Sequence, residues 1–229
     1  MKYKAIIFDM DGTITNSEKV WQQATKDLIL NKGIQITDDI YAELEQNIRG
    51  LALHNSCNII KNQFTLEHSL EELIAEKRNR AVELLKEGLT FIDGFERFHK
   101  KVVDEQILIG IATNADDYAL QASKNALELD RYFGEHIYNI SHVNNKAKPH
   151  PDLYLHVAKQ LQIEPYYCIA FEDSAHGVRA AKRAGMFCVG INTAQDRAAL
   201  HESDLIIDHY DEIELQRLLH RTGIKIIKE

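Results

Sequence analysis

From residue 94 onward, the chain alternates short apolar runs rich in β-branched residues with segments of helical periodicity. Parallel strands need a long crossover connection, usually a helix, so this alternation predicts an α/β fold with a Rossmann-like parallel sheet and helices on both faces. An apolar run near the N-terminus adds one more strand. The predicted strands are 4–8, 106–112, 136–139, 166–171, 187–190 and 204–207.

Between the first strand and residue 92, apolar residues recur at helical spacing and no run predicts a strand. The chain therefore leaves the sheet after its first strand and returns to it later. We expect a core domain of residues 1–15 and 92–229 and an inserted all-helical cap domain of residues 16–91, which opens and closes over the carboxyl end of the first strand. The predicted cap helices are 17–31, 38–48, 53–64 and 69–86.

Composition limits the class of protein. The 229 residues, 45% of them hydrophobic, can supply a core, and the net charge of −8 includes no basic stripe that would favour a nucleic acid or an anionic membrane as partner. No apolar run approaches the roughly 18 residues of a membrane span, and the first strand begins too early for a signal peptide, so we expect a cytoplasmic protein. Cys57, Cys168 and Cys188 lack metal-ligand spacing and are expected to be reduced core thiols.

The first predicted strand runs into two carboxylates, Asp9 and Asp11, followed by Gly12. Side chains two residues apart on a strand share a face, so both carboxylates are expected to point the same way, at the end where open α/β sheets bind ligands. Like charges held this close repel, which indicates a metal or an acid/base pair. A solvated turn or a calcium loop is the alternative interpretation, although no Glu stands at the twelfth position of such a loop.

Two further segments carry groups suited to an anion. Thr113 and Asn114 stand between a strand and a helix N-terminus, which favours an oxyanion or phosphate, although Asn114 or Asp116 would also serve as an ordinary helix cap. Lys148 lies in a segment stiffened by two prolines and is expected to neutralise an anion or an aspartyl phosphate. A solvated loop lysine is the alternative, and His150 is expected at the surface.

A second strand runs into paired carboxylates, Glu172 and Asp173. Magnesium prefers oxygen ligands, so Asp9, Asp173 and one backbone carbonyl would form a partial Mg²⁺ shell. Helix capping by Asp173 or Ser174 is the alternative. Because all four segments lie where a strand ends, a shared site explains them better than four unrelated loops.

Together these segments resemble, in order and approximate spacing, the four signature motifs of the haloacid dehalogenase superfamily. The inserted helices resemble the C1 cap of members similar to β-phosphoglucomutase and phosphoglycolate phosphatase. The matching segments are Asp9-Met10-Asp11-Gly12-Thr13, Thr113-Asn114, Lys148-Pro149-His150-Pro151-Asp152, and Glu172-Asp173-Ser174 with Gly177, Ala180, Ala181 and Ala184-Gly185-Met186.

The resemblance implies a mechanism. Asp9 would attack the phosphorus of a phosphomonoester to give an aspartyl phosphate, and Asp11 would act as general acid and base. Magnesium would be held by Asp9, the Asp11 carbonyl and Asp173, with Glu172 acting through a bound water. The transferring oxygens would be held by Thr113, Asn114 and Lys148.

The resemblance also limits the reaction. Dehalogenases and phosphonate-cleaving relatives lack an acid at the position of Asp11, so we expect phosphoryl chemistry. A mutase similar to β-phosphoglucomutase would carry a His about where Trp21 stands, so a phosphatase is the main hypothesis. A phosphosugar mutase and a non-catalytic binding protein on the same fold are the alternatives.

The substrate is expected to be a small phosphorylated metabolite, a sugar phosphate or a phosphoglycolate-like compound, and the protein a monomer or weak homo-oligomer. Arg49 is the main candidate for a substrate contact from the cap. Four further cap residues are weaker candidates, each with an ordinary surface or packing role as its alternative: Trp21, His54, Lys77 and Arg80.

Overall fold

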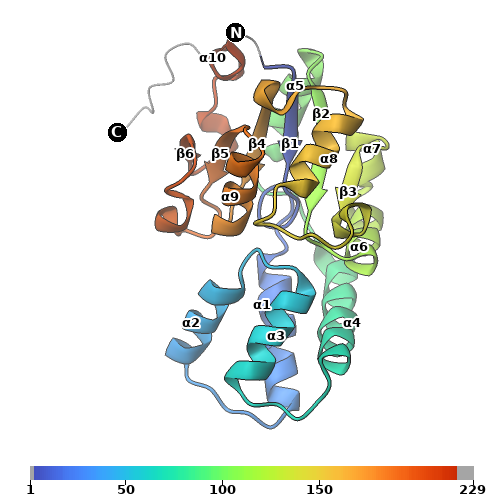
Figure 1. The fold of residues 1–229 in the computed structure, drawn as a ribbon, viewed down its shortest axis with the longest axis vertical. Helices are drawn as coiled ribbons and strands as arrows, with labels where there is room; N and C mark the ends of the chain where they lie inside the picture. The colour runs from blue at the N-terminus through green and yellow to red at the C-terminus, as the bar shows by residue number, and fades with distance from the viewer. Residues whose placement is uncertain (1–2, 221–229) are drawn as a thin grey trace.

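The structure is a computed structural model that describes residues 3–220. Its centre is a parallel six-stranded sheet in the order β3-β2-β1-β4-β5-β6. This confirms the predicted α/β class, because the chain adds strands first to one side of β1 and then to the other through helical crossovers (Figure 1). The strands are β1 (Ala5–Phe8), β2 (Leu108–Thr113), β3 (Ile137–Asn139), β4 (Cys168–Glu172), β5 (Phe187–Ile191) and β6 (Leu205–Ile207).

Helices cover both faces of the sheet. Alternate side chains of β1 divide between two cores, with Ile6 and Phe8 in one and Ala5 and Ile7 in the other. On the Phe8 face lie α5 (Phe95–Asp104), α6 (Asp117–Leu127), α7 (Leu129–Phe133) and α10 (Leu215–His220); on the Ile7 face lie α8 (Asp152–Gln160) and α9 (Ala175–Arg183). Short 3₁₀ helices cover Ile140–Val143, Pro165–Tyr167, Arg197–Leu200 and Tyr210–Glu212.

Strand ends differ from the predicted boundaries for local reasons. The prediction started one strand at residue 106, but Gln106 has a φ of 56° and the strand begins at Leu108. It started another at residue 166, where a 3₁₀ turn, Pro165–Tyr167, precedes β4. Three strands also extend one residue further than predicted, to Thr113, Glu172 and Ile191.

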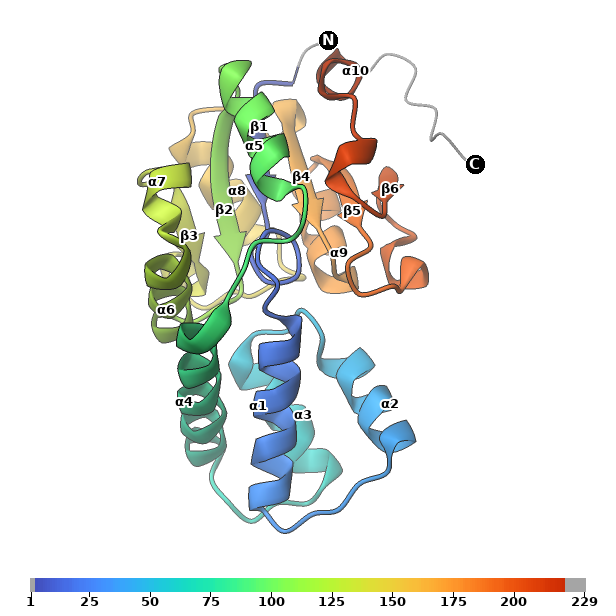
Figure 2. The same cartoon turned by 180° about the vertical axis from the view of Figure 1, so that it is seen from behind.

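Four helices form a separate layer beyond the carboxyl ends of the strands, as Figures 1 and 2 show. They enclose their own apolar cluster, which includes Leu28, Leu44, Cys57, Ile60 and Leu73. Their bounds lie close to the predicted ones: α1 (Glu18–Asn31), α2 (Asp38–Ile48), α3 (Leu53–Gln63) and α4 (Leu70–Gly88). The longest, α4, begins at a capping box in which Ser69 and Glu72 satisfy each other's backbone N–H groups.

The two chain crossings between the layers run side by side. Thr15 and Phe91 form an antiparallel bridge, the Asn16 N–H donates to the Thr90 carbonyl at 2.8 Å, and the Ile92 N–H donates to the Ile14 carbonyl at 2.9 Å. The two segments that connect the layers are therefore hydrogen-bonded to each other.

The helical layer also contacts the sheet layer away from these crossings. Arg78 of α4 pairs with Asp116 at 2.5 Å and stacks over the Tyr118 ring at 4.9 Å. The Asn114 amide donates to the Gly50 carbonyl at 2.9 Å. The two layers are therefore in direct contact beside the chain crossings.

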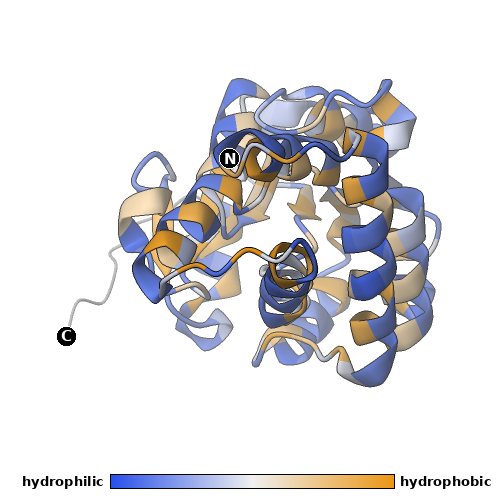
Figure 3. Ribbon diagram, turned by 90° about the horizontal axis from the view of Figure 1, so that it is seen from below, coloured by the Kyte–Doolittle hydropathy of each residue, from blue (hydrophilic) through white to orange (hydrophobic). Residues whose placement is uncertain are grey.

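No helix within residues 3–220 is long and apolar enough to cross a membrane. Figure 3 shows helices banded with hydrophilic and hydrophobic residues rather than continuously apolar ones. The three cysteines are buried and form no disulfide, which agrees with the expectation of core thiols.

Aromatic packing under β1 generates the first prediction. Phe98 of α5 packs against both Phe171 and Tyr210, with ring centroids 5.3 Å from each, and is almost fully buried. Phe98→Ala should lower the free energy of unfolding by about 3–5 kcal/mol because it removes apolar burial and leaves a cavity. Val103→Ala on the same helix is the control, since Val103 is 47% exposed. Urea unfolding measures both; equal losses would refute this account of the core.

Candidate active site

The carboxyl ends of the strands and the helical layer enclose a cavity of about 110 Å³. Of the site residues predicted from sequence, Glu172, His54 and Arg80 do not line the cavity. The others do, from the sheet side Asp9, Asp11, Thr113, Asn114, Lys148 and Asp173, and from the helical side Arg49, Trp21 and Lys77.

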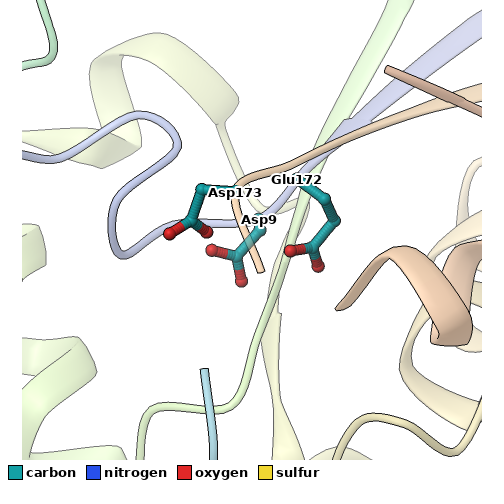
Figure 4. Close-up of side chains that lie close together, drawn as sticks. All are labelled: Asp9, Glu172 and Asp173. Carbon is teal, nitrogen blue, oxygen red and sulfur yellow. The ribbon is translucent and has the colours of Figure 1, made fainter. Parts of the chain in front are cut away.

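Three carboxylates meet at the sheet side of this cavity. Asp9 follows β1, while Glu172 ends β4 and Asp173 follows it; Phe8 and Phe171 are paired in the two neighbouring strands, which places these side chains together. One carboxylate oxygen from each lies within 4.8 Å of the others, and Figure 4 shows the three groups converging. The parallel register of β1 and β4 therefore produces the cluster that the sequence predicted.

Lys148 connects two of these carboxylates. Its ammonium group is buried, 2.5 Å from Asp9 Oδ1 and 2.6 Å from Glu172 Oε1. Burial disfavours the charged lysine, but the two carboxylates outweigh this effect and raise the pKa of Lys148. The alternative of a solvated loop lysine is therefore wrong.

Glu172 lies beneath the cavity and already has protein partners. Besides Lys148, it accepts hydrogen bonds from the Tyr154 hydroxyl at 2.6 Å and the Ser174 hydroxyl at 3.3 Å. Ser174 also caps α9 by accepting from the Gly177 N–H, as one alternative had proposed. In this structure Glu172 therefore positions Lys148 and Tyr154 rather than facing the cavity.

The negative charges of Asp9 and Asp173 are only partly neutralised by protein groups. Burial raises the pKa of both groups, and for Asp173 the charges of Asp9 and Glu172 raise it further, because one lysine cannot neutralise three carboxylates. Within residues 3–220, the Asp173 carboxylate has a single hydrogen-bond donor, Thr13 at 3.3 Å. A buried, under-neutralised set of carboxylate oxygens fits a hard divalent cation such as Mg²⁺.

Asp11 lies elsewhere than the strand geometry predicted. The strand ends at Phe8, so Asp9 and Asp11 do not share a strand face, and the Asp11 carboxylate is outside the acidic cluster. It turns to helix α1, accepting from the Ser17 hydroxyl at 2.6 Å and the Trp21 indole at 3.1 Å. Burial, and after it the charge of Asp9, raises the pKa of Asp11.

Gly12 allows this turn. Its φ is 81°, and a Cβ there would lie 2.3 Å from Asp173 Oδ2. Its carbonyl accepts a hydrogen bond from the Thr193 hydroxyl at 2.7 Å. A side chain at this position would therefore displace a carboxylate of the cluster, so the glycine that ends the Asp-x-Asp-Gly pattern is required sterically.

Thr113 and Asn114 lie at the cavity with most of their polar atoms engaged. Thr113 Oγ1 accepts from the Ala115 N–H at 3.0 Å. Asn114 bridges the layers, since its oxygen accepts from the Lys148 N–H at 2.9 Å while its amide reaches Gly50. The cap of α6 is Asp116, not Asn114.

The cap candidates divide into two groups. Arg49, Trp21 and Lys77 line the cavity, and Arg49 pairs with Glu18 at 3.2 Å. Arg80 and His54 do not line it; Arg80 pairs with Asp27 at 2.6 Å on the cap surface, and His54 is exposed. His150 is exposed, as expected.

Sequence analysis missed several residues of this region. Tyr154 follows the Lys148 segment on the buried face of α8, and this periodicity is a signal that could have found it. The cavity-lining Glu45 and Ser56 carry no such signal, because each lies on an amphipathic cap helix among other polar residues.

Comparisons of the sequence and of the structure with known proteins indicate the same family. A family model described as haloacid dehalogenase-like hydrolase matches residues 3–185. The chain is 29% identical to validoxylamine A 7'-phosphate phosphatase of Streptomyces hygroscopicus subsp. limoneus, over 92% of this chain and 96% of that protein. It is 29% identical to a phosphorylated carbohydrates phosphatase of Thermotoga maritima, over 80% and 82%. The crystal structure of β-phosphoglucomutase from Clostridium difficile superposes with a TM-score of 0.77 at 26% identity, covering 96% of each chain.

The packing around Glu172 generates the second prediction. A Cβ at Gly177 would lie 1.9 Å from the Glu172 carboxyl carbon, which cannot move freely because Lys148, Tyr154 and Ser174 hold it. Gly177→Ala should therefore destabilise the protein by about 1–3 kcal/mol, although alanine is the better helix former.

Gly88→Ala is the matched control. Gly88 is also helical and a Cβ there meets nothing within 4 Å, so the substitution should be neutral or stabilising by up to about 1 kcal/mol. Both are measured by urea unfolding. A Gly177→Ala protein as stable as wild type would show that Glu172 is not held as described.

Proposed function

Because the chain belongs to the haloacid dehalogenase-like hydrolase family, we propose that it is a magnesium-dependent phosphatase of a small phosphomonoester. The observation that carries the proposal is the buried cluster of Asp9, Lys148, Glu172 and Asp173 at the strand ends, with Asp11 beside it in the same cavity. We further propose that residues 16–91 act as a cap that closes over this cluster.

Asp9 is the proposed nucleophile. Lys148 holds its Oδ1 at 2.5 Å, which fixes the carboxylate and leaves Oδ2 for attack on phosphorus. The new bond joins Asp9 Oδ2 to phosphorus as the bond to the substrate oxygen breaks, giving an aspartyl phosphate and an alcohol. Water then attacks phosphorus, which releases inorganic phosphate and restores the Asp9 carboxylate. Lys148 disperses negative charge in both steps.

Asp11 is the proposed general acid and base. In its protonated form the carboxyl group gives a proton to the leaving oxygen in the first step and regains one from water in the second, and burial raises its pKa in the direction that this role needs. Ser17 and Trp21 fix the position of its carboxyl group from the helical layer. Without this acid the first step would expel an unprotonated alkoxide, a poor leaving group.

Asp9 and Asp173 are the side chains that would hold Mg²⁺, with the Asp11 carbonyl as a third oxygen. A bound cation would offset the repulsion between the carboxylates and the phosphate group. Thr113 and Asn114 border the cavity where the phosphoryl oxygens would lie. Two relatives are named as phosphatases, one of validoxylamine A 7'-phosphate and the other of phosphorylated carbohydrates. Both names support a small phosphate ester as the substrate.

A phosphosugar mutase is the second candidate, because the solved β-phosphoglucomutase covers nearly the whole chain. Trp21 argues against it. Its indole holds Asp11 from the helical layer but has no proton to exchange near neutral pH. We therefore favour hydrolysis over transfer.

The third prediction concerns Asp9. Asp9→Asn should abolish phosphate release from a panel of hexose phosphates, hexitol phosphates and phosphoglycolate, because an amide cannot form the aspartyl phosphate. It should also abolish the stable complex with Mg²⁺ and beryllium fluoride, read by ¹⁹F NMR. Asp27→Asn, a cap carboxylate that pairs with Arg80, is the control and should behave as wild type. Turnover by Asp9→Asn at the wild-type rate would refute the assignment, and isomer conversion without phosphate release by the wild type would favour the mutase.

The fourth prediction concerns Asp11. Asp11→Asn should lose about 100-fold or more in kcat on an alkyl phosphate, since general acid catalysis contributes about 10²–10⁴-fold. The loss should be much smaller on p-nitrophenyl phosphate, whose leaving group needs no proton. Steady-state rates on both substrates measure the difference. Equal losses on the two would count against an acid role.

A further inference from the structure

Tyr154 of α8 lies beside the acidic cluster and has no part in the proposed phosphoryl transfer. It is fully buried, and its hydroxyl group donates to Glu172 Oε1 at 2.6 Å. Its ring lies against the ammonium group of Lys148, with 5.0 Å between the ring centroid and Nζ. One side chain therefore contacts both the carboxylate and the lysine that set the charge balance of the site.

The hydroxyl group of Tyr154 acts as a hydrogen-bond donor in this contact. A tyrosine hydroxyl keeps its proton near neutral pH, whereas an ionised carboxylate only accepts. Hydrogen bonds to a charged acceptor are shorter and stronger than neutral ones, which agrees with the separation of 2.6 Å. A phenylalanine would fill the same place in the apolar core of this face of the sheet. The hydroxyl group therefore adds this one hydrogen bond to the packing of the ring.

Glu172 is held at both of its carboxylate oxygens. Oε1 accepts from Lys148 and Tyr154, and Oε2 accepts from Ser174 at 3.3 Å. Helix α9 packs tightly behind the carboxylate, because a Cβ at Gly177 would lie 1.9 Å from the carboxyl carbon. The backbone of α9 therefore bounds the carboxylate on one side, while three donors fix the direction of its oxygens.

Glu172 is also close enough to the other carboxylates to reach a shared cation. One oxygen each of Asp9, Glu172 and Asp173 lies within 4.8 Å of the others (Figure 4). A cation bound by the two aspartates would attract the glutamate, and the three hydrogen bonds described above oppose that movement. The number of carboxylates that contact the cation therefore depends on how firmly Glu172 is held.

The number of carboxylate ligands affects which cation is preferred. Mg²⁺ demands near-ideal octahedral geometry and keeps several waters, whereas Ca²⁺ takes about six to eight oxygens in flexible geometry, bidentate carboxylates included. A third carboxylate ligand would therefore favour Ca²⁺ over Mg²⁺. Movement of Glu172 to the cation would also leave Lys148 with Asp9 as its carboxylate partner.

We propose that Tyr154 is a positioning residue whose hydroxyl group holds Glu172 on Lys148 and off the cation, and that it thereby sets the preference of the site for Mg²⁺ over Ca²⁺. The inference rests on the cation site of the proposed function. Tyr154 acts through Glu172 and does not itself contact the cation.

The test measures Mg²⁺ and Ca²⁺ binding to chelator-treated protein by titration calorimetry. It compares wild type, Tyr154→Phe, Tyr132→Phe and the double variant Tyr154→Phe/Glu172→Gln. Tyr154→Phe keeps the ring against Lys148 and removes the hydroxyl group alone. Tyr132→Phe is the matched control, because its hydroxyl group donates to exposed Glu96 at 2.7 Å and it does not line the cavity.

The Kd for Mg²⁺ divided by the Kd for Ca²⁺ should rise about tenfold or more in Tyr154→Phe, since a hydrogen bond to a charged group is worth about that factor. Tyr132→Phe should keep the wild-type ratio. The double variant should lose the rise, because a neutral amide attracts a cation less than a carboxylate does. A purely structural role of the hydroxyl group would not produce this dependence on Glu172.

An unchanged ratio in folded Tyr154→Phe would overturn the inference. So would a raised ratio that the double variant keeps, or a wild type that binds neither cation. Urea unfolding checks that each variant is folded. If Tyr154→Phe is not, Ser174→Ala replaces it, since it frees the other oxygen of Glu172 and should raise the same ratio; an unchanged ratio there would equally refute the inference.

Failure of the proposed function would appear separately. It would be seen as no hydrolysis of any phosphomonoester, p-nitrophenyl phosphate included, by a wild-type protein that binds Mg²⁺. Because calorimetry of the cations needs no substrate, the ratio in Tyr154→Phe decides on the positioning role in that case as well.

Discussion

The buried ammonium group of Lys148 is the interaction on which the site depends. It contacts Asp9 after β1 and Glu172 at the end of β4, and its backbone N–H is held by Asn114 after β2. These strands are neighbours, in the order β2-β1-β4, so the topology of the sheet is what brings the three partners to one lysine. An isolated buried charge is very unfavourable. The order of the strands, the neutralisation of the Lys148 charge and the close packing of α9 against Glu172 therefore depend on one another.

Asp11 links this sheet-side cluster to the helical layer. Its carboxylate is held by Ser17 and Trp21 at the start of α1, whereas its backbone belongs to the turn after β1. The position of the proposed acid therefore depends on where α1 lies. Contacts of Arg78 with Asp116 and of Asn114 with Gly50 maintain the same arrangement from the other side of the cavity. The position of the Asp11 carboxylate and the packing of the helical layer on the sheet layer are therefore coupled.

The sequence was sufficient to predict the strands, the helical insertion and the convergence of Asp9, Lys148 and Asp173, because strand ends of a parallel sheet share an edge. It was insufficient for Asp11, since the two-residue periodicity that predicted a shared face stops at Phe8. The sequence named Lys77 as a weak cap candidate, but it gave no indication that Glu45 lies in the same cavity. Each looks like a solvated residue on its own helix, and only the packing of α2 against α3 and of α3 against α4 brings them to one cavity. Periodicity reports burial within an element, not which elements meet.

The two sides of the cavity differ in how their charges are balanced, and this bears on the choice between hydrolysis and transfer. On the sheet side, three carboxylates face one lysine, which leaves a net charge of −2 that one divalent cation would offset. On the helical side, Glu18 and Glu45 already match Arg49 and Lys77. An enzyme that moved a phosphoryl group between two hydroxyls of one sugar would pass through a species with phosphates at both ends. The helical side has no spare positive charge for the second phosphate, so the charge distribution agrees with hydrolysis of a phosphate ester rather than with phosphoryl transfer within one sugar.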